Sequence, residues 1–213
     1  MSNKVGILGS GGVAQTLAKG FAAAGYDVQM GSRDPSKLAE FAESAGVTTG
    51  TLEAVVDGAP LLVLAVKGTA AEPIVNALAH LLVGKVVIDV NNPIADGPPE
   101  GGIVPYFTGP NDSLLERLQA AAPAARFVKS WSCVGAHLMI HPQLPGGRPS
   151  MFICGDDAGA KAQVAAILDG FGWDVEDIGG RQGARAIEPL CQLWCAPGFL
   201  RNDWVHAFKM LRP

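Results

Sequence analysis

The stretch "VGILGSGGVAQTLAKGF", residues 5–21, decides the fold of this chain. Residues 5–8 predict a short strand, and residues 12–24 carry apolar side chains at helical spacing as far as Gly25. The turn between them, Gly9 to Ala14, has the form G-x-G-x-x-A. A strand, a glycine-rich turn and a helix in this order are typical of the first unit of an open α/β sheet.

The same alternation continues outward through the first half of the chain. Apolar runs predict further strands at residues 27–30, 47–50, 61–66, 85–90 and 126–130. Helical segments are predicted from Asp34-Pro35 and at about residues 70–82 and 113–122, and a Pro/Gly-rich loop covers residues 93–112. The run at 61–66 is apolar throughout, as expected of a strand buried on both faces. The predicted fold class is therefore α/β, a Rossmann-type doubly wound parallel sheet.

A smaller second part follows a Pro/Gly-rich loop at residues 142–149. Its pattern predicts a strand at 151–154, a helix at 157–170, a strand at 173–178 and a long helical region from Ala184. We therefore predict a first domain at residues 1–136 and a small C-terminal α/β extension at residues 137–213, packed on the first.

The glycine-rich turn predicts a phosphate cradle. Glycines let the backbone approach a pyrophosphate closely, and the N–H groups at the start of a helix attract it. An ordinary tight turn between strand and helix is the alternative. The surrounding strand, helix and second strand are the context that dinucleotide binding requires, so we expect Gly9, Ser10, Gly11, Gly12 and Val13 to hold a dinucleotide.

The turn after the second strand indicates which dinucleotide is bound. An NAD site places a carboxylate at the end of that strand, but here Gly31-Ser32-Arg33 stands there and the acid is delayed to Asp34. Asp34 before Pro35 predicts an ordinary helix N-cap. The hydroxyl, guanidinium and ammonium groups of Ser32, Arg33 and Lys37 suit a 2′-phosphate, which predicts NADP(H). The alternative is a solvated surface arginine.

Ligands of open α/β sheets bind beyond the carboxyl ends of the strands, where three more stretches are expected. These are Val66-Lys67-Gly68, Asn91-Asn92-Pro93-Ile94 and Ser132-Cys133-Val134-Gly135. From them we add Val66, Lys67, Asn92, Pro93, Val134 and Gly135 to the predicted cofactor-binding residues.

Composition limits the partners. The net charge of −4 argues against nucleic acid, which basic surfaces bind, and residues 61–66 are too few to span a bilayer. Residues 5–24 contain five glycines and precede no cleavage-site pattern, so we expect structure there and not a signal peptide. Cys191 and Cys195 would share one helix face, but their spacing matches no zinc pattern. We expect no metal, and reduced thiols in the cytoplasm.

Taken together, five stretches make the chain resemble the family of F420-dependent NADP oxidoreductases. They are "GILGSGGVAQTLAKGFAAAGYDVQMGSRD", "VIDVNNPI", "VKSWSCVGAHLM", "MFICGDDAGAK" and "IGGRQGARAIEPL". The resemblance implies that the first domain holds NADP(H) and that the C-terminal domain encloses an acceptor, coenzyme F420 or a flavin such as FMN or FAD. Similar domains form the cytosolic half of membrane ferric reductases. We expect a cytoplasmic homodimer.

One departure from the family concerns the acceptor side. The segment after "VK" usually resembles Ala-Phe-Asn-Thr-Val-Gly, whereas residues 130–135 here are Ser-Trp-Ser-Cys-Val-Gly. We expect Trp131 and Val134 to form walls of the acceptor pocket, so this difference bears on which acceptor is used.

No acid–base pair stands out, and we predict no catalytic side chain. His80 and His206 lie away from the predicted site, while His137 and His141 follow the acceptor-side segment. Hydride transfer between nicotinamide and a deazaflavin or flavin can run on positioning alone. One alternative is an NADPH-dependent reductase of a small carbonyl or imine, with His137 or Lys67 as proton donor. Another is a non-enzymatic NADP(H) sensor.

Overall fold

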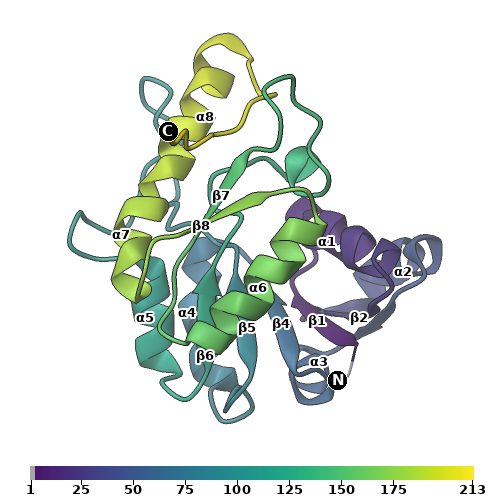
Figure 1. Ribbon diagram of the computed structural model, residues 1–213. Coiled ribbons are helices and arrows are strands. Elements are labelled where there is room, and N and C mark those ends of the chain that lie inside the picture. Colours follow the sequence, from purple (N-terminus) through teal and green to yellow (C-terminus); the bar gives the residue numbers. More distant parts are fainter. Residues whose placement is uncertain (1–2) are drawn as a thin grey trace.

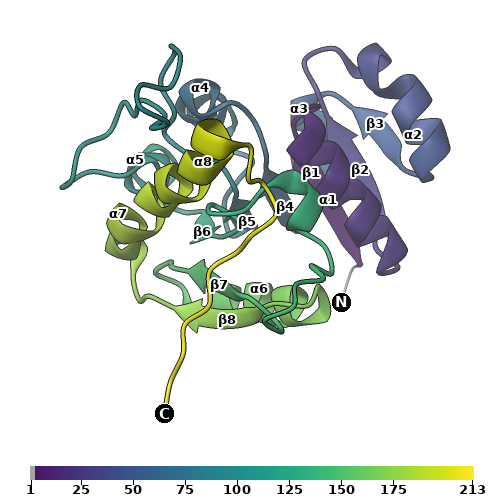
Figure 2. The same cartoon turned by 90° about the horizontal axis from the view of Figure 1, so that it is seen from above.

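Residues 3–213 are described by a computed structural model, which contains a six-stranded parallel sheet with helices on both faces (Figures 1 and 2). The strands lie in the order β3-β2-β1-β4-β5-β6, which is the doubly wound order predicted from the sequence. Its strands are β1 (Lys4–Leu8), β2 (Asp27–Gly31), β3 (Thr48–Gly50), β4 (Leu61–Leu64), β5 (Val86–Asp89) and β6 (Arg126–Lys129). Its helices are α1 (Gly12–Ala23), α2 (Ala39–Ala45), α3 (Leu52–Gly58), α4 (Gly68–Leu78) and α5 (Leu114–Ala121).

The apolar strands are buried on both faces because successive side chains point in opposite directions. In β4, Leu61 and Val63 join the cluster beneath α1 and α2, whereas Leu62 and Leu64 join the cluster beneath α3, α4 and α5. All four side chains are at most 2% exposed, which explains why the sequence of β4 shows no alternation of polar and apolar residues.

The middle of the C-terminal part, residues 150–177, packs mainly on the face of the sheet that carries α1, whereas residues 184–187 pack beside α5 on the opposite face (Figure 2). It contains β7 (Ser150–Ile153), α6 (Ala158–Gly170), β8 (Asp174–Asp177), α7 (Ala184–Ile187) and α8 (Pro189–Arg201), with β7 and β8 paired in parallel. The segment after α8 returns to β7, where the Ser150 N–H donates to the Phe208 carbonyl at 2.8 Å. Both parts contribute side chains to both hydrophobic clusters of the sheet, and the division at residue 136 remains a proposal.

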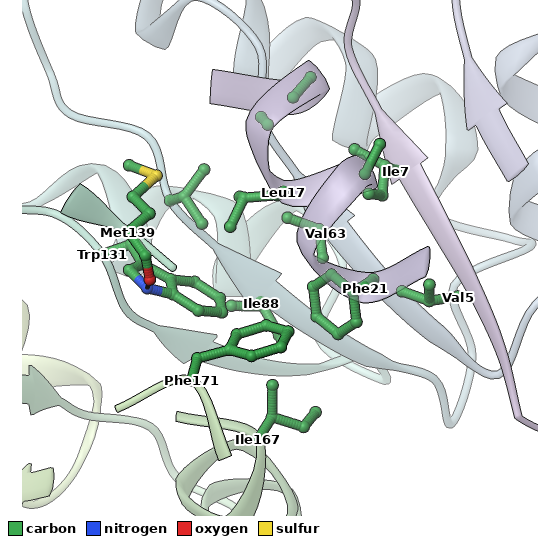
Figure 3. Packing of buried hydrophobic residues seen from close by; sticks show 14 of the residues in the cluster. Val5, Ile7, Leu17, Phe21, Val63, Ile88, Trp131, Met139, Ile167 and Phe171 are labelled. Atoms are coloured by element: carbon green, nitrogen blue, oxygen red, sulfur yellow. Dashed lines mark hydrogen bonds between the residues drawn. The ribbon is translucent and has the colours of Figure 1, made fainter. Parts of the chain in front are cut away.

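An aromatic cluster joins the two parts (Figure 3). Phe21 of α1 meets Phe171 edge-on, with ring centroids 5.2 Å apart, and the Trp131 ring lies 6.1 Å from Phe171. Trp131 is only 1% exposed, and its indole N–H donates to the Met139 carbonyl at 3.2 Å. The structure thus contradicts the expectation that Trp131 forms a wall of the acceptor pocket. Burying a large aromatic side chain in the core stabilises the fold more than leaving it exposed in a pocket wall.

The start of the segment after β2 also differs in detail from the sequence prediction. A 3₁₀ turn, Pro35–Leu38, precedes α2, with Asp34 at its N-cap position. The Asp34 carboxylate accepts no backbone N–H of that turn and instead accepts the Ser36 hydroxyl at 2.5 Å. That hydroxyl, together with the nearby Lys37 ammonium, holds the pKa of Asp34 below its usual value.

Among residues 3–213, no helix combines the length and the apolar composition needed to cross a membrane.

Candidate functional site

The turn between β1 and α1 is open on the side where a ligand would approach. Gly9 has φ +138°, and a Cβ there would stand 2.0 Å from the Ala65 carbonyl oxygen, so only glycine fits. A Cβ at Gly11 or Gly12 would meet nothing within 4 Å. Gly11 is the N-cap of α1 and supplies no side-chain cap, and no acidic residue lies in the first turn. The helix therefore presents unpaired N–H groups and partial positive charge to this empty space.

A cleft begins at this turn and runs along the carboxyl ends of the strands. Its first part has a volume of about 350 Å³ and is lined mainly by residues 9–13, 31–33 and 65–67. A second hollow of about 260 Å³ shares Val13 and residues 65–67 with the first and extends to Asn91, Asn92 and Ile94. We call the two together the cofactor cleft. It extends from Arg33 at one end to Asn92 at the other, as an elongated dinucleotide requires.

Two of the three residues predicted to bind a 2′-phosphate line the cofactor cleft. Ser32 and Arg33 lie in its wall, and the Ser32 hydroxyl accepts the Asp34 N–H at 3.2 Å. The Arg33 side chain forms no ion pair with any residue in 3–213. Lys37 does not line the cleft; its ammonium stands 3.6 Å from the Asp34 carboxylate. The free guanidinium is therefore the main positive group at this end.

The opposite end of the cofactor cleft is formed by Val66, Lys67, Asn91 and Asn92. The Val66 N–H donates to the Asn91 side-chain oxygen at 2.9 Å, and the Asn92 amide donates to the Ser132 carbonyl at 2.8 Å. These bonds join the ends of β4, β5 and β6. Lys67 forms an ion pair with Asp96 at the exposed rim. Pro93 is buried behind the turn and does not line the cleft.

Val134 and Gly135 do not line the cofactor cleft either. Val134 is 8% exposed and belongs to the hydrophobic cluster under α1. A Cβ on Gly135 would stand 2.6 Å from the Trp194 ring, so the backbone there packs directly against α8. The chain has glycine at this position because only a residue without a side chain allows that contact.

The histidines and thiols lie outside the cofactor cleft. His137 is exposed and its Nε2 lies 3.0 Å from the Trp204 carbonyl, while the exposed His141 lies beside Phe171. Burial raises the pKa of the Cys133 thiol to about 12. Cys191 and Cys195 share a helix face as predicted, with their sulfurs 3.9 Å apart. Residues 3–213 contain no group of three His, Cys, Asp or Glu side chains placed to hold a metal ion.

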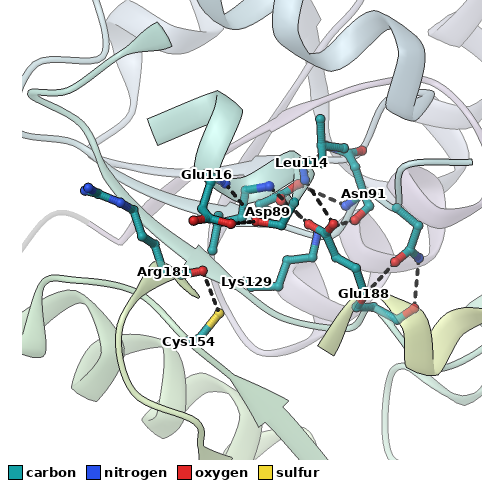
Figure 4. A network of polar contacts seen from close by, with 12 residues as sticks. Asp89, Asn91, Leu114, Glu116, Lys129, Cys154, Arg181 and Glu188 are labelled. Atoms are coloured by element: carbon teal, nitrogen blue, oxygen red, sulfur yellow. Dashed lines mark hydrogen bonds and ion pairs between the residues drawn. The ribbon is translucent and has the colours of Figure 1, made fainter. Parts of the chain in front are cut away.

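The sequence analysis missed a set of charged side chains buried behind the Asn91–Asn92 turn (Figure 4). The Lys129 ammonium lies 2.9 Å from the Asp89 carboxylate and 3.0 Å from the Glu188 carboxylate. Asp89 and Lys129 end the paired strands β5 and β6, and Glu188 precedes α8. The sequence pattern that could have predicted this cluster is a charged residue at the end of each of two largely apolar strands, Asp89 in "VVID" and Lys129 in "RFVK".

Comparison with known proteins decides the family. A sequence profile described as NADP oxidoreductase, coenzyme F420-dependent, matches residues 4–93. A solved structure from Arthrobacter sp. FB24, described as a candidate F420-dependent NADP reductase, has 32% identity and a TM-score of 0.91. The alignment covers 98% of this chain and 99% of that one. The chain belongs to the F420-dependent NADP oxidoreductase family. The family and the fold class predicted from the sequence are thereby confirmed.

Two further proteins resemble this chain, one in sequence and one in fold. The rat metalloreductase STEAP3 is 30% identical over 187 residues, which are 88% of this chain but 36% of that protein. The chain thus spans about a third of this curated relative. An imine reductase from Streptomyces aurantiacus has a TM-score of 0.68 at 18% identity, over 92% of this chain and 63% of that one, and shows the fold alone. NADP(H) as the cofactor is supported by the family, and the described cleft fits it.

Proposed function

We propose that the protein transfers a hydride between NADPH and a deazaflavin (F420) or flavin acceptor. The observation that carries this proposal is the cofactor cleft, with a free guanidinium at one end, an open glycine cradle in the middle and an amide turn at the other end. This order of groups corresponds to the 2′-phosphate, pyrophosphate and nicotinamide of NADP(H). When bound, that cofactor supplies or accepts the hydride.

The chain's own residues would bind and orient the cofactor. Ser32 and Arg33 supply a hydroxyl and a guanidinium for the 2′-phosphate, and Gly11 and Gly12 leave the N-terminus of α1 accessible to the pyrophosphate. Val66 and Asn92 border the part of the cleft left for the nicotinamide. Positioning two rings face to face is the contribution expected of the protein in a direct hydride transfer.

The cleft lining supports a mechanism without a general acid or base. Its titratable side chains are Arg33, at the far end, and Lys67, which is paired with Asp96. A carbonyl or imine reductase would need a proton donor beside the hydride, and Lys67 is the side chain that would have to serve. We therefore favour a deazaflavin or flavin as the acceptor.

The test is an acceptor panel. The protein is incubated with NADPH and, in separate reactions, with F420, FMN, FAD, ferric chelates, a cyclic imine and a small ketone, while NADPH absorbance is followed. Oxidation of NADPH with F420 or a flavin supports the proposal. Turnover confined to the imine or ketone contradicts the proposed acceptor, and binding of NADPH without turnover on any acceptor indicates a sensor.

A homodimer remains a proposal of the same kind. Leu193 and Leu200 of α8 are 58% and 63% exposed. They are seven residues apart and so lie on the same face of the helix, where a second copy of the chain would cover them. Light scattering after gel filtration measures the mass directly, and a monomer at micromolar concentration contradicts the proposal.

A further inference from the structure

Lys129 stands behind the cofactor cleft: its own side chain does not line the cleft, but its ammonium donates to the carbonyl of Asn91, which does. Its side chain and that of Asp89 are 0% exposed, and the side chain of Glu188 is 2% exposed. Ionised groups taken out of water are strongly unfavourable unless each has partners of opposite charge and its hydrogen bonds are satisfied. This cluster must therefore be fully paired for the protein to fold around it.

The cluster satisfies that requirement through all three protons of the ammonium. Lys129 donates to the Asp89 carboxylate, the Glu188 carboxylate and the Asn91 carbonyl. Burial by itself would lower the pKa of Lys129, but the two carboxylates outweigh burial and raise it, so the side chain stays charged.

The second carboxylate is balanced by a helix terminus. Glu188 accepts the backbone N–H groups of Leu114 and Leu115, the first residues of α5, at 2.9 and 3.0 Å. These donors and the positive end of the helix offset the extra negative charge. Because Glu188 comes from the C-terminal part, the cluster forms only when that part is docked on the sheet.

From Asp89 the contacts continue to the cofactor cleft. One Asp89 oxygen accepts both the backbone N–H of Asn91, at 3.0 Å, and its side-chain amide, at 2.8 Å. The Asn91 amide is therefore fixed with its oxygen toward the Val66 N–H, which it accepts at 2.9 Å. Lys129 holds the Asn91 carbonyl on the other side. The orientation of two residues that line the cleft is thus set by a buried ion cluster (Figure 4).

We propose that Lys129 is a positioning residue for the nicotinamide end of the cofactor cleft, acting through Asp89 and Asn91, and that Glu188 makes this positioning depend on the docked C-terminal part. The inference rests on the proposed function, because it assumes that the nicotinamide ring binds at the Asn91 end of the cofactor cleft. An apolar cluster could hold the two parts together, but it could not orient an amide.

The first readout needs no cofactor. Hydrogen exchange is measured at individual backbone amides of the ligand-free protein for wild type, Lys129→Met and the matched control Lys161→Met. Lys161 forms its ion pair with Asp177 in the C-terminal part, away from the cleft. We expect exchange at Val66 and Asn91 to accelerate at least tenfold in Lys129→Met and to be unchanged in the control.

The second readout is the hydride step. With NADPH and acceptor both saturating, we expect the single-turnover rate of Lys129→Met to fall about 10- to 100-fold, since small misplacements of reacting groups have effects of this size. The dissociation constant for NADPH should change less than about threefold, because the phosphates are bound elsewhere. A folded variant with wild-type exchange at Val66 and Asn91 and a wild-type rate would overturn the inference.

A second variant separates positioning from simple loss of stability. Lys129→Met/Asp89→Asn removes the carboxylate left without a partner and keeps Glu188 on the N-terminus of α5, so we expect it to recover thermal stability, but exchange at Asn91 should remain fast because its carbonyl has no ammonium partner. Recovery of stability and exchange together would show a merely structural role. If wild type neither binds nor oxidises NADPH, the proposed function fails, while the exchange data still decide the role of Lys129.

Discussion

At the Arg33 end of the cofactor cleft the charged side chains are exposed and their partners are neighbours in the sequence, whereas at the Asn91 end they are buried and their partners are distant. The Lys37 side chain is 77% exposed and pairs with Asp34 three residues away. Lys129 is 0% exposed and pairs with Asp89, 40 residues away. Charges at the first end can be changed without unfolding the protein, because water replaces what is lost. At the Asn91 end, substituting a buried charge changes both the geometry of the cleft residues and the stability of the fold.

The largest effect is expected from breaking the buried end. Lys129→Met leaves two buried carboxylates without their ammonium, so the free energy of unfolding should fall by about 3–5 kcal/mol. Lys161→Met removes an ion pair whose side chains are 16% and 48% exposed, so that water reaches the Asp177 carboxylate left behind, and the loss should be smaller, about 1 kcal/mol. Urea unfolding of both variants measures the difference. Equal losses would show that burial of the ion pair at the Asn91 end does not set the size of the effect.

The next effect tests the middle of the cleft. Gly11→Val should fold normally, since nothing lies within 4 Å of the added Cβ, yet it fills the space kept for the pyrophosphate. NADPH affinity should fall roughly 100-fold or more, because at least two charge-assisted hydrogen bonds are lost. Titration and circular dichroism measure binding and folding. Undiminished binding by the folded variant contradicts the cradle assignment.

Gly9→Val is the matched comparison for Gly11→Val. Its Cβ would overlap the Ala65 carbonyl, and its φ of +138° is unsuited to a β-branched residue. This variant should lose thermal stability, where Gly11→Val should not. The same substitution two residues apart thus separates backbone packing from ligand space.

A smaller effect is expected at the exposed end. Arg33→Ala removes the free guanidinium, and NADPH affinity should fall about 10- to 100-fold, the value of one charge-assisted contact. NADH affinity should change little, since NADH has no 2′-phosphate. Stability should be unchanged because Arg33 is exposed. A wild-type preference for NADH, or an equal loss for both cofactors, contradicts the 2′-phosphate assignment.

The smallest effect is expected outside both ends. His137→Ala, His141→Ala and Cys133→Ala should each keep turnover within about tenfold of wild type, below the 10²–10⁴-fold range of a lost general acid or base. None of these side chains lines the cofactor cleft. Single-turnover rates across pH measure this. A thousandfold loss in His137→Ala with one limb of the pH profile missing would favour the carbonyl or imine reductase.

The exposed end and the cradle were predicted from the sequence because their signals are local. The glycine pattern at residues 9–12 and the Ser32-Arg33 pair follow directly on strands, and the structure places all of them in the cleft. Lys37, one turn into the following helical segment, was assigned from its charge and its place near Arg33 in the sequence, and its side chain does not line the cleft. Proximity in the sequence does not set the direction of an exposed side chain.

The predictions were weakest after β6. Trp131 was expected in a pocket wall and lies in the core, and Val134 and Gly135 pack under α1 and α8 instead of lining the cleft. The positions of these side chains depend on how the C-terminal part packs on the sheet. Local sequence patterns do not predict that packing. The alternation of apolar runs and helices, by contrast, gave the strands of the sheet nearly at their observed bounds.

The sequence by itself determined the doubly wound parallel sheet, the glycine turn after β1 and the arginine after β2, since backbone conformation and hydrophobic periodicity act over a few residues. Only the tertiary structure decided that Lys129, Asp89 and Glu188 meet in the interior behind Asn91. Glu188 reaches the start of α5 across 74 residues of chain. A charge is stable in the interior only beside its partners, and which partners it meets is fixed by packing of the whole chain.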